Sequence, residues 1–413
     1  MRDARIIGIV LLLIMVLPLG AGAQDECVAA QGEPLVIGAV FPRAALLTAR
    51  SGESLNGAEA MRSAINACGG VHGRPLEWQL VEAQDRYSAE AAVQTLAAAG
   101  VPLIVGSGSP AVSEGAREAA DAAGVVYWEV SEAVEAPGAW TFSPRPNGRQ
   151  MGQDAARLID AQFPAARTAL IYEDSAPARA IAAGVRDTLL NAPLIDEEYN
   201  GGDDYGLALR LREERIDALL LITFESDGYF LWYNAREADA NVDAWLHIGG
   251  TGYWRGLCAR QANVEGFMSL AAYGPVSVEY RQSVMGTLEQ EYREAYTRAQ
   301  NTPPSLEADL SAAGVYLLLR YGLPALEGDW SAENMRATLQ ALTVEMGSGM
   351  LGEGLLFVAG VNQAAVSIVR QQQNRLFCSV APEAVATCLT GVQPLPTWRE
   401  RARATNWGCA PEA

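Results

Sequence analysis

The sequence predicts an α/β protein with two doubly wound parallel-sheet lobes, and three observations carry that prediction. Short apolar runs of strand type alternate with helical patterns along most of the chain. A Pro- and Gly-rich stretch at 137–148 interrupts the alternation, which then starts again. The chain has 413 residues, 50% of them hydrophobic, which suffices for two or three domains with sizeable cores. Strands that alternate with helices form parallel sheets, and the restart indicates two of them.

The first block of the pattern ends near residue 130. The apolar run 35–40 predicts a buried strand, and the helix after it is stopped by Gly69-Gly70. Apolar residues recur at helical spacing along that helix: Leu55, Ala58, Met61, Ile65 and Cys68. Ser109 and Pro110 are residue types of a helix N-cap and first helical position. The remaining elements of the block are predicted at 76–80, 88–99, 101–105, 110–124 and 125–130.

The second block starts with a helix that ends near 161. Strands and helices then alternate at 169–172, 178–190, 194–199, 204–214, 218–224, 228–239 and 244–248. From about 275 the pattern becomes helical, over 279–300 and 306–326. The chain closes with strand-like segments around 355–358 and 364–370 and a tail that carries cysteines.

Composition and charge exclude several classes of protein. The balance of apolar, charged, Gly and Pro residues is that of a globular chain, which excludes a disordered, collagen-like or coiled-coil protein. The net charge of -19 opposes binding to nucleic acid or to an anionic membrane surface. We therefore expect a soluble chain, and a monomer.

Residues 1–23 have the pattern of a cleaved signal peptide. Arg2 and Arg5 supply the positive start, Ile6–Leu19 the apolar run, and Ala21–Ala23 a cleavage site of small residues. The apolar run is shorter than the roughly 20 residues of a membrane-spanning helix. We expect the mature chain to begin at Gln24 and to be exported to the periplasm or the extracellular space; the alternative is an uncleaved anchor.

Six cysteines in an exported chain favour disulfide bonds. Cys27 precedes the first strand and Cys68 ends the following helix, so both lie at one end of a strand–helix unit and are expected to pair. Cys378 and Cys388 bracket a short loop and are expected to close it. If these two pairs form, Cys258 and Cys409 remain as the third possible pair. The chain has no C-x-x-C sequence and only two histidines, so a zinc site is not indicated.

Ligands of open parallel sheets bind beyond the carboxyl ends of the strands, where five predicted loops lie. The loop Ser107-Gly108-Ser109 combines two hydroxyls, a Gly for close approach and a helix N-terminus, which suits an anionic group. The alternative is that Ser109 only caps the helix. The other loops carry acidic side chains that could pair with an ammonium group, or that are simply solvated: Glu132, Glu173, Asp174, Glu225 and Asp227.

Enzymatic readings find little support. Residues 106–111 match G-x-G-x-x-A, and Glu129 follows at the spacing of a dinucleotide fingerprint. That loop follows the third predicted strand and not the first, and an exported chain meets little NAD. The chain lacks G-x-S-x-G, H-E-x-x-H and P-loop sequences. His72 and His247 have no nucleophile nearby in sequence, and His247 is interpreted as a core residue. No cofactor is implied.

A family resemblance covers almost the whole mature chain. The segments 35–42, 57–60 and 65–77 resemble the opening of type I periplasmic binding proteins, and Asp85 stands where that family has an Asp. Residues 105–116 are similar to the ligand loop and helix of its leucine/isoleucine/valine-binding branch, which serves ABC importers. The resemblance implies two lobes joined by three crossovers. It places lobe one at 34–145 plus 273–346, lobe two at 146–272 plus 347–395, and a tail at 396–413.

The resemblance also implies site residues. Ser109 aligns with the loop that holds an α-carboxylate, with Pro110 and Ala111 in place of further serines. A Thr that helps to hold the ammonium falls on Glu132, and a ring of the second lobe on Phe224. Another aromatic residue of the family aligns near Pro177, so this chain has no ring there. The acidic residue with which the family holds the ammonium group aligns near Gly250–Thr251. The expected ligand-binding residues are Ser107, Ser109, Pro110, Ala111, Val130, Ser131, Glu132, Phe224, Glu225, Gly250, Thr251 and Tyr253.

These observations predict an exported solute-binding protein for a small polar ligand, such as an amino acid or an amide. Its expected partner is the membrane permease of an ABC importer. The rival readings are a binding protein that serves a membrane sensor and, on the same fold, an exported NAD-linked or hydrolytic enzyme.

Overall fold

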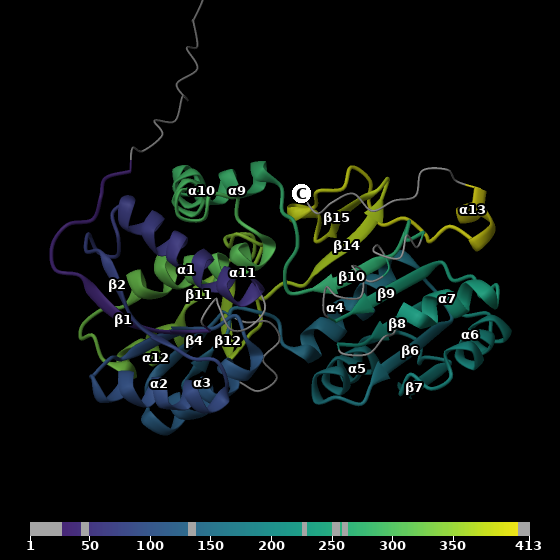
Figure 1. Ribbon diagram of the computed structural model, residues 1–413, viewed down its shortest axis with the longest axis horizontal. Helices are drawn as coiled ribbons and strands as arrows, with labels where there is room; N and C mark the ends of the chain where they lie inside the picture. Colours follow the sequence, from purple (N-terminus) through teal and green to yellow (C-terminus); the bar gives the residue numbers. More distant parts are fainter. Residues whose placement is uncertain are drawn as a thin grey trace, which may run out of the picture.

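The computed structural model describes residues 27–42, 49–130, 138–224, 229–249, 257 and 263–403. Two sheet-containing lobes lie side by side, one built largely from the N-terminal third of the chain and the other from its middle (Figure 1). Doubly wound parallel sheets are thereby confirmed as the basis of the fold.

The sheet of the first lobe has five parallel strands in the order β2-β1-β3-β4-β5. The strands are β1 (Leu35–Phe41), β2 (Leu76–Glu82), β3 (Leu103–Gly106), β4 (Val126–Glu129) and β5 (Thr141–Phe142). Helices α2 (Arg86–Ala98) and α3 (Pro110–Ala123) pack together and bury one sheet face. Helix α1 (Ala49–Ala67) packs on the other face.

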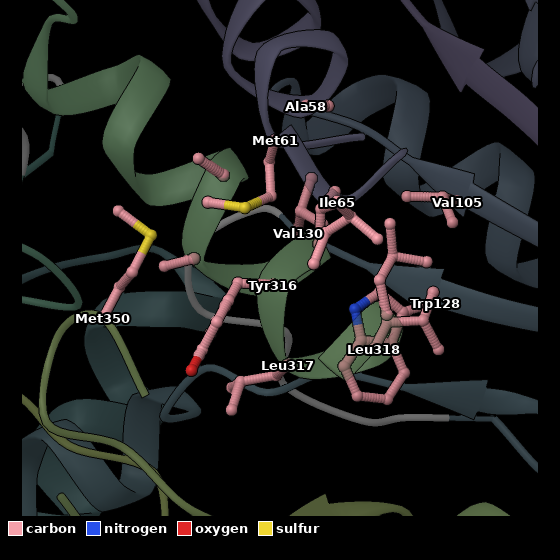
Figure 2. Packing of buried hydrophobic residues seen from close by; sticks show 14 of the residues in the cluster. Ala58, Met61, Ile65, Val105, Trp128, Val130, Tyr316, Leu317, Leu318 and Met350 are labelled. Carbon is pink, nitrogen blue, oxygen red and sulfur yellow. The ribbon is translucent and has the colours of Figure 1, made fainter. Parts of the chain in front are cut away.

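Chain that returns from the second lobe completes the core of the first. The returning helices are α9 (Val278–Met285), α10 (Thr287–Gln300), α11 (Leu306–Leu317) and α12 (Ala332–Ala341). A small antiparallel sheet follows, with β11 (Thr343–Val344), β12 (Leu355–Val358) and β13 (Val361–Asn362). Figure 2 shows Tyr316, Leu317 and Leu318 of the α11 region packed with Trp128 and Val130 of the sheet.

Two predicted helices are interrupted in the structure. The helix expected at 279–300 breaks at Gly286, whose φ of 58° lies in the left-handed region that Gly adopts without strain. The helix expected at 306–326 ends as an α-helix at Leu317 and continues as a π-helical turn, Leu318–Gly322, and a 3₁₀ turn, Leu323–Ala325. Pro324 has no amide hydrogen for the α-helical ladder, which explains the change of hydrogen-bond pattern.

The second sheet has seven strands in the order β15-β14-β10-β9-β8-β6-β7. The strands are β6 (Thr168–Glu173), β7 (Ile195–Tyr199), β8 (Ala218–Ile222), β9 (Ala244–Ile248), β10 (Met268–Ala271), β14 (Ile368–Gln373) and β15 (Leu376–Ala381). Its last two strands are antiparallel, so the sheet is mixed and not purely parallel. Sequence patterning missed β10 and β15, whose short runs lack a clear period.

Helices cover both faces of the second sheet. On one face lie α4 (Gly148–Gln162) and α5 (Ala176–Thr188). On the other lie α6 (Asp204–Glu213), α7 (Tyr229–Glu237) and the short C-terminal helix α13 (Trp398–Arg403). None of the helices described here has the length and apolarity that crossing a membrane requires, and the apolar run 6–19 lies outside the described residues.

The chain crosses between the lobes three times, over 143–147, 272–277 and 363–367. The first crossing is tied to the segment that precedes the third: Asn362 donates from Nδ2 to the Pro144 carbonyl at 3.0 Å, and Arg145 forms a buried ion pair with Glu353 at 3.1 Å. The buried residues of 347–362 pack in the core of the first lobe. The family resemblance had placed this segment in the second lobe; the likeness did not show which core these apolar residues join.

Two of the expected disulfide bonds are present. Cys27 and Cys68 are joined with a Cα–Cα distance of 4.2 Å, and Cys378 and Cys388 with one of 5.2 Å. The first bond fastens the chain before β1 to the end of α1. The third expected pair, Cys258–Cys409, lies outside the described residues.

Candidate functional site

The loop after β3 is held in place by hydrogen bonds beneath it. Ser107 is fully buried, and its Oγ donates to the Ser109 carbonyl at 2.9 Å and accepts from the Ser109 amide at 3.2 Å. The Ser107 hydroxyl also lies 3.0 Å from that of Ser113 on α3. Ser107 is thus a residue that shapes the loop from below.

Ser109 is the N-cap residue of α3 by position, but its side chain makes no capping hydrogen bond. Its hydroxyl has no hydrogen-bond partner within the described part of the chain, and the residue is only partly buried. The first intrahelical bond runs from the Ser113 amide to the Ser109 carbonyl at 2.9 Å, so the preceding N–H groups of Ala111 and Val112 lie at the helix N-terminus. A hydroxyl and a helix N-terminus side by side suit an anionic group.

Gly108 fits this loop because it lacks a side chain. A Cβ on Gly108 would lie 2.2 Å from Cβ of Ser54, which is on α1 and is itself buried. Ser54 in turn is hydrogen-bonded to Ser311 of α11. The loop is therefore braced against two helices, and Gly108, Pro110 and Ala111 lie on its exposed side.

Glu129 ends β4 directly below this loop and was not expected to be a buried acid. Its side chain is 1% exposed and is hydrogen-bonded to Ser113. Burial raises the pKa of Glu129 to about 7, although the Ser113 bond and the charge of Arg117 act in the opposite direction. A carboxylate buried in this way cannot reach a ribose, which removes the structural basis of the dinucleotide fingerprint. Spacing alone matches Glu129 to the acidic position of the fingerprint, and spacing gives no information on what covers the side chain.

At the carboxyl edge of the second sheet, polar groups form hydrogen bonds and ion pairs with one another. Glu173 accepts the Phe224 amide at 2.8 Å and the Ser175 hydroxyl at 3.0 Å. Asp174 forms an ion pair with Arg179. Both acids were expected to be able to hold an ammonium group, but their carboxylates are occupied. Phe224 remains 38% exposed and is the aromatic surface of this edge.

His247 lies in β9 at 1% exposure, and its Nε2 is 3.0 Å from Thr223 Oγ1 and 3.1 Å from the Thr223 carbonyl. Burial lowers the pKa of His247 to about 3, so the ring is neutral at physiological pH. Gly249 follows with φ of 152°, and a Cβ there would lie 2.0 Å from the Thr223 carbonyl. The interpretation of His247 as a hydrogen-bonded core residue agrees with this geometry.

The expected ligand residues fall into three groups. Ser109, Pro110, Ala111 and Phe224 lie at the carboxyl edges of the two sheets with accessible surface. Ser107 and Val130 are fully buried, and the side chain of Val130 packs under α11, as Figure 2 shows. The remaining expected residues lie outside the described residues: Ser131, Glu132, Glu225, Gly250, Thr251 and Tyr253.

A cavity of about 1000 Å³ lies elsewhere, between the C-terminal end of α1, the Cys27–Cys68 disulfide, α9, α10 and the π-helical turn. None of the expected ligand residues lines it. The end of α1 lies at the amino edge of the first sheet, opposite the loops described above, so this cavity is separate from the expected ligand residues. Among the described residues, no group of three His, Cys, Asp or Glu side chains is arranged to hold a metal ion.

Comparisons with known proteins agree with this architecture. The family model described as periplasmic binding protein matches residues 34–372. Leu/Ile/Val-binding protein homolog 8 of Brucella melitensis is 25% identical over 395 residues, covering 89% of this chain and 95% of that protein. The same-named protein of Brucella suis matches to the same extent.

Solved structures show the same fold. An ABC transporter substrate-binding protein of Desulfitobacterium hafniense in complex with Leu superposes with a TM-score of 0.64 at 21% identity, covering 84% of this chain and 100% of that chain. A putative branched-chain amino acid ABC transporter protein of Silicibacter pomeroyi gives a TM-score of 0.68 at 16% identity, covering 89% and 100%.

The match to the family model extends over most of the chain, and the relatives are matched over almost their whole length. The predicted resemblance is therefore confirmed, and with it the prediction of a binding protein and not an enzyme. The chain belongs to the periplasmic binding protein family and is a solute-binding protein with two α/β lobes.

Proposed function

We propose that this protein captures a small amino-acid-like ligand between its lobes and delivers it to the permease of an ABC importer. The observation that carries the proposal is the Ser109 hydroxyl, which has no partner among the described residues, at the N-terminus of α3. A carboxylate placed there would accept hydrogen bonds from this hydroxyl and from amides of the first helical turn, and would meet the positive end of the helix dipole.

The second lobe supplies an aromatic surface. Phe224 is 38% exposed, and Glu173 fixes its backbone through the 2.8 Å hydrogen bond from its amide. A ligand with an apolar side chain would pack against this ring, whereas the occupied Glu173 and His247 offer it no free polar group. We propose Glu132 or Glu225 as the partner of an ammonium group, as the family resemblance suggests.

The names of the relatives support the ligand class. The Brucella proteins are named Leu/Ile/Val-binding protein homologues, and the Desulfitobacterium structure contains Leu. We propose export through a cleaved signal peptide and lobe boundaries that follow the three crossings at 143–147, 272–277 and 363–367. A ligand that contacts both lobes favours the closed form over the open form by its differential affinity for the two.

Thermal unfolding of residues 24–413 with a panel of amino acids, amides, polyamines and NAD tests the ligand class. A ligand at one hundred times its Kd adds about 2.7 kcal/mol, which raises the Tm by roughly 3 °C for a chain of this size. We expect a shift with an amino acid or an amide, reduced in Ser109→Ala at equal concentration. A shift with NAD alone, or an amino-acid shift unchanged in Ser109→Ala, would overturn the proposed site.

Delivery to an importer is tested separately. Cells that lack this protein should lose uptake of the ligand found in the panel, and re-expression of the full chain should restore it. Uptake that is unchanged in cells without the protein contradicts the transport role while leaving ligand binding intact.

A further inference from the structure

A small pocket lies on the second lobe between α13, α7 and residue 263. Its volume is about 120 Å³, and its walls come from Trp232, Tyr233, Arg236, Asn263, Trp398, Arg401 and Ala402. The Trp398 indole donates to the Ala240 carbonyl at 2.7 Å, and the Leu395 amide to the Asp243 carbonyl at 2.7 Å. Both acceptors precede β9, so α13 and the pocket lie at the amino edge of the sheet. The pocket is thus separate from the proposed ligand site.

Arg401 points a charged group into this pocket without a counter-charge bonded to it. The side chain is 3% exposed, and its guanidinium lies 3.6 Å from the ring centre of Trp398 and 5.0 Å from that of Trp232. Its Nε donates to the Pro396 carbonyl at 2.6 Å. Both terminal nitrogens, Nη1 and Nη2, have no hydrogen-bond partner within the described residues.

The nearest acid does not bond to that guanidinium. Glu400 is the neighbour of Arg401 in sequence, but its carboxylate accepts the Thr397 amide at 2.8 Å and the Thr397 hydroxyl at 2.7 Å. Burial lowers the pKa of Arg401 to about 9, against the opposing effect of the Glu400 charge. Native proteins seldom leave a buried charge without hydrogen bonds, because desolvation is costly.

Other polar groups of the pocket complete a site for an anion. The Tyr233 hydroxyl is buried and also lacks a hydrogen-bond partner among the described residues. Arg236 is exposed at the mouth, with its guanidinium 5.9 Å from the Tyr233 ring centre. The Asn263 amide donates to the Arg401 carbonyl at 2.8 Å and fixes the backbone of α13 there. The pocket therefore has unused donors and positive charge in a chain whose net charge is -19.

We propose that this pocket binds a small monocarboxylate, held by the Arg401 guanidinium and the Tyr233 hydroxyl. The guanidinium presents two parallel N–H groups that match the two oxygens of a carboxylate. Two indole rings form the wall and suit a short alkyl chain. A volume of about 120 Å³ admits only a small molecule, such as an acid of two to three carbons.

Saturation-transfer NMR on residues 24–413 tests the proposal, with acetate and propionate as probes at constant ionic strength. We expect both probes to bind, with propionate at least as tight as acetate. Arg401→Gln should weaken binding at least tenfold, and Tyr233→Phe several-fold. Arg399→Gln removes an exposed Arg of the same helix and should change nothing.

Three results would overturn the proposal. The first is absence of binding at 100 mM probe, and the second is equal binding by the parent chain, Arg401→Gln and Tyr233→Phe. The third is binding of inorganic phosphate in place of both carboxylates, which would assign the pocket to another class of anion. Tyr233→Phe removes only a hydroxyl, so it remains informative if Arg401→Gln fails to fold.

Discussion

The carboxyl edges of the two sheets use their polar groups in different ways. At the first edge, Ser107 and Ser113 hold the loop from below, and the Ser109 hydroxyl has no partner in the part of the chain that the structure describes. At the second edge, Glu173 and His247 are occupied by bonds to their own lobe, and the accessible feature is the Phe224 ring. This difference is the basis of our proposal that the first lobe binds the polar end of a ligand and the second covers its apolar part.

The two edges also differ in their response to pH. Glu129 lies below the first edge with its pKa raised to about 7, and His247 lies in the second sheet with its pKa lowered to about 3. Between pH 6.5 and 8, only Glu129 of this pair changes its charge in the folded state. The polar edge is therefore the one that physiological pH affects.

The largest expected effect comes from filling the space at Gly108. In Gly108→Ala the new Cβ would lie 2.2 Å from Cβ of Ser54, so the loop must move. We expect the free energy of unfolding to fall by about 3 kcal/mol and ligand binding to be lost. Urea denaturation and the ligand-induced Tm shift measure both. Gly391→Ala is the control, because nothing lies within 4 Å of a Cβ at that position. Adding Ser54→Gly to Gly108→Ala removes the Cβ that is in the way, so this double variant should regain part of the lost stability. A stable, ligand-binding Gly108→Ala would mean that the loop is not braced as described.

Glu173→Ala tests the second edge. It removes the acceptor of the Phe224 amide and of the Ser175 hydroxyl, and hydrogen bonds to a charged group contribute about 1.5–3 kcal/mol. We expect a loss of about 2 kcal/mol in urea denaturation and weaker ligand binding. Asp174→Ala breaks only an exposed ion pair with Arg179 and should cost less than about 1 kcal/mol. Equal losses in the two variants would contradict the bracing role of Glu173.

Glu129→Gln sharpens the pH comparison. The raised pKa means that the folded state holds a proton which the unfolded state releases, so Glu129 lowers stability as the pH rises from about 4.5 to 7, and the full cost remains above 7. We expect Glu129→Gln to be about 2 kcal/mol more stable than the parent at pH 8 and nearly equal to it at pH 4. Urea denaturation at both pH values measures this, and a variant equally shifted at both would exclude titration as the cause.

The pH dependence of stability that His247 contributes has the opposite sign to that of Glu129. Its lowered pKa means that the unfolded state takes up a proton which the folded state refuses, so its contribution to stability is lost as the pH falls below 6.5 towards 3. Glu129→Gln should therefore leave the loss of stability at acid pH in place.

The smallest effect on stability is expected for Ser109→Ala. Loss of a capping serine ordinarily costs about 1 kcal/mol, but here the capping bond is absent, so we expect less than about 0.5 kcal/mol. Ligand affinity should fall about tenfold if this hydroxyl binds the carboxylate. Calorimetric titration with the ligand and urea denaturation separate the two effects; a destabilised variant with unchanged affinity would make Ser109 a helix cap and nothing more.

Much of the fold could be predicted because its signals are local. The apolar run of β1, the helically spaced apolar residues of α1 and the Gly-Gly stop after it all lie within a few residues of the structure that they specify. The Cys27–Cys68 bond was predictable for the same reason, since a strand and the helix after it return the chain to one end. Patterning missed β15, and the family resemblance placed 347–362 in the other lobe; both depend on partners distant in sequence.

One feature of the candidate site follows from the sequence. The position of Ser109 at the start of α3 was predictable, because a helix after a parallel strand begins at the carboxyl edge. The family resemblance suggested Val130 as a ligand contact, and the acidic side chain of Glu173 suggested a partner for an ammonium group. Packing buries Val130, and hydrogen bonds occupy Glu173. Residue type shows which interactions a side chain can make, whereas its neighbours in the fold determine which of its groups can still contact a ligand.

By itself, the sequence determined the alternation of strands and helices, the two-lobe plan and the edge of the sheet at which Ser109 lies, because hydrophobic period and chain direction are local properties. Only the tertiary structure decided which polar groups of the described residues are buried or left without partners. The Ser109 hydroxyl, the buried Glu129 and the Arg401 guanidinium differ from their many chemical equals in the chain through contacts with residues far away in sequence. Desolvation and hydrogen bonding act between neighbours in space, and no period in the sequence encodes those neighbours.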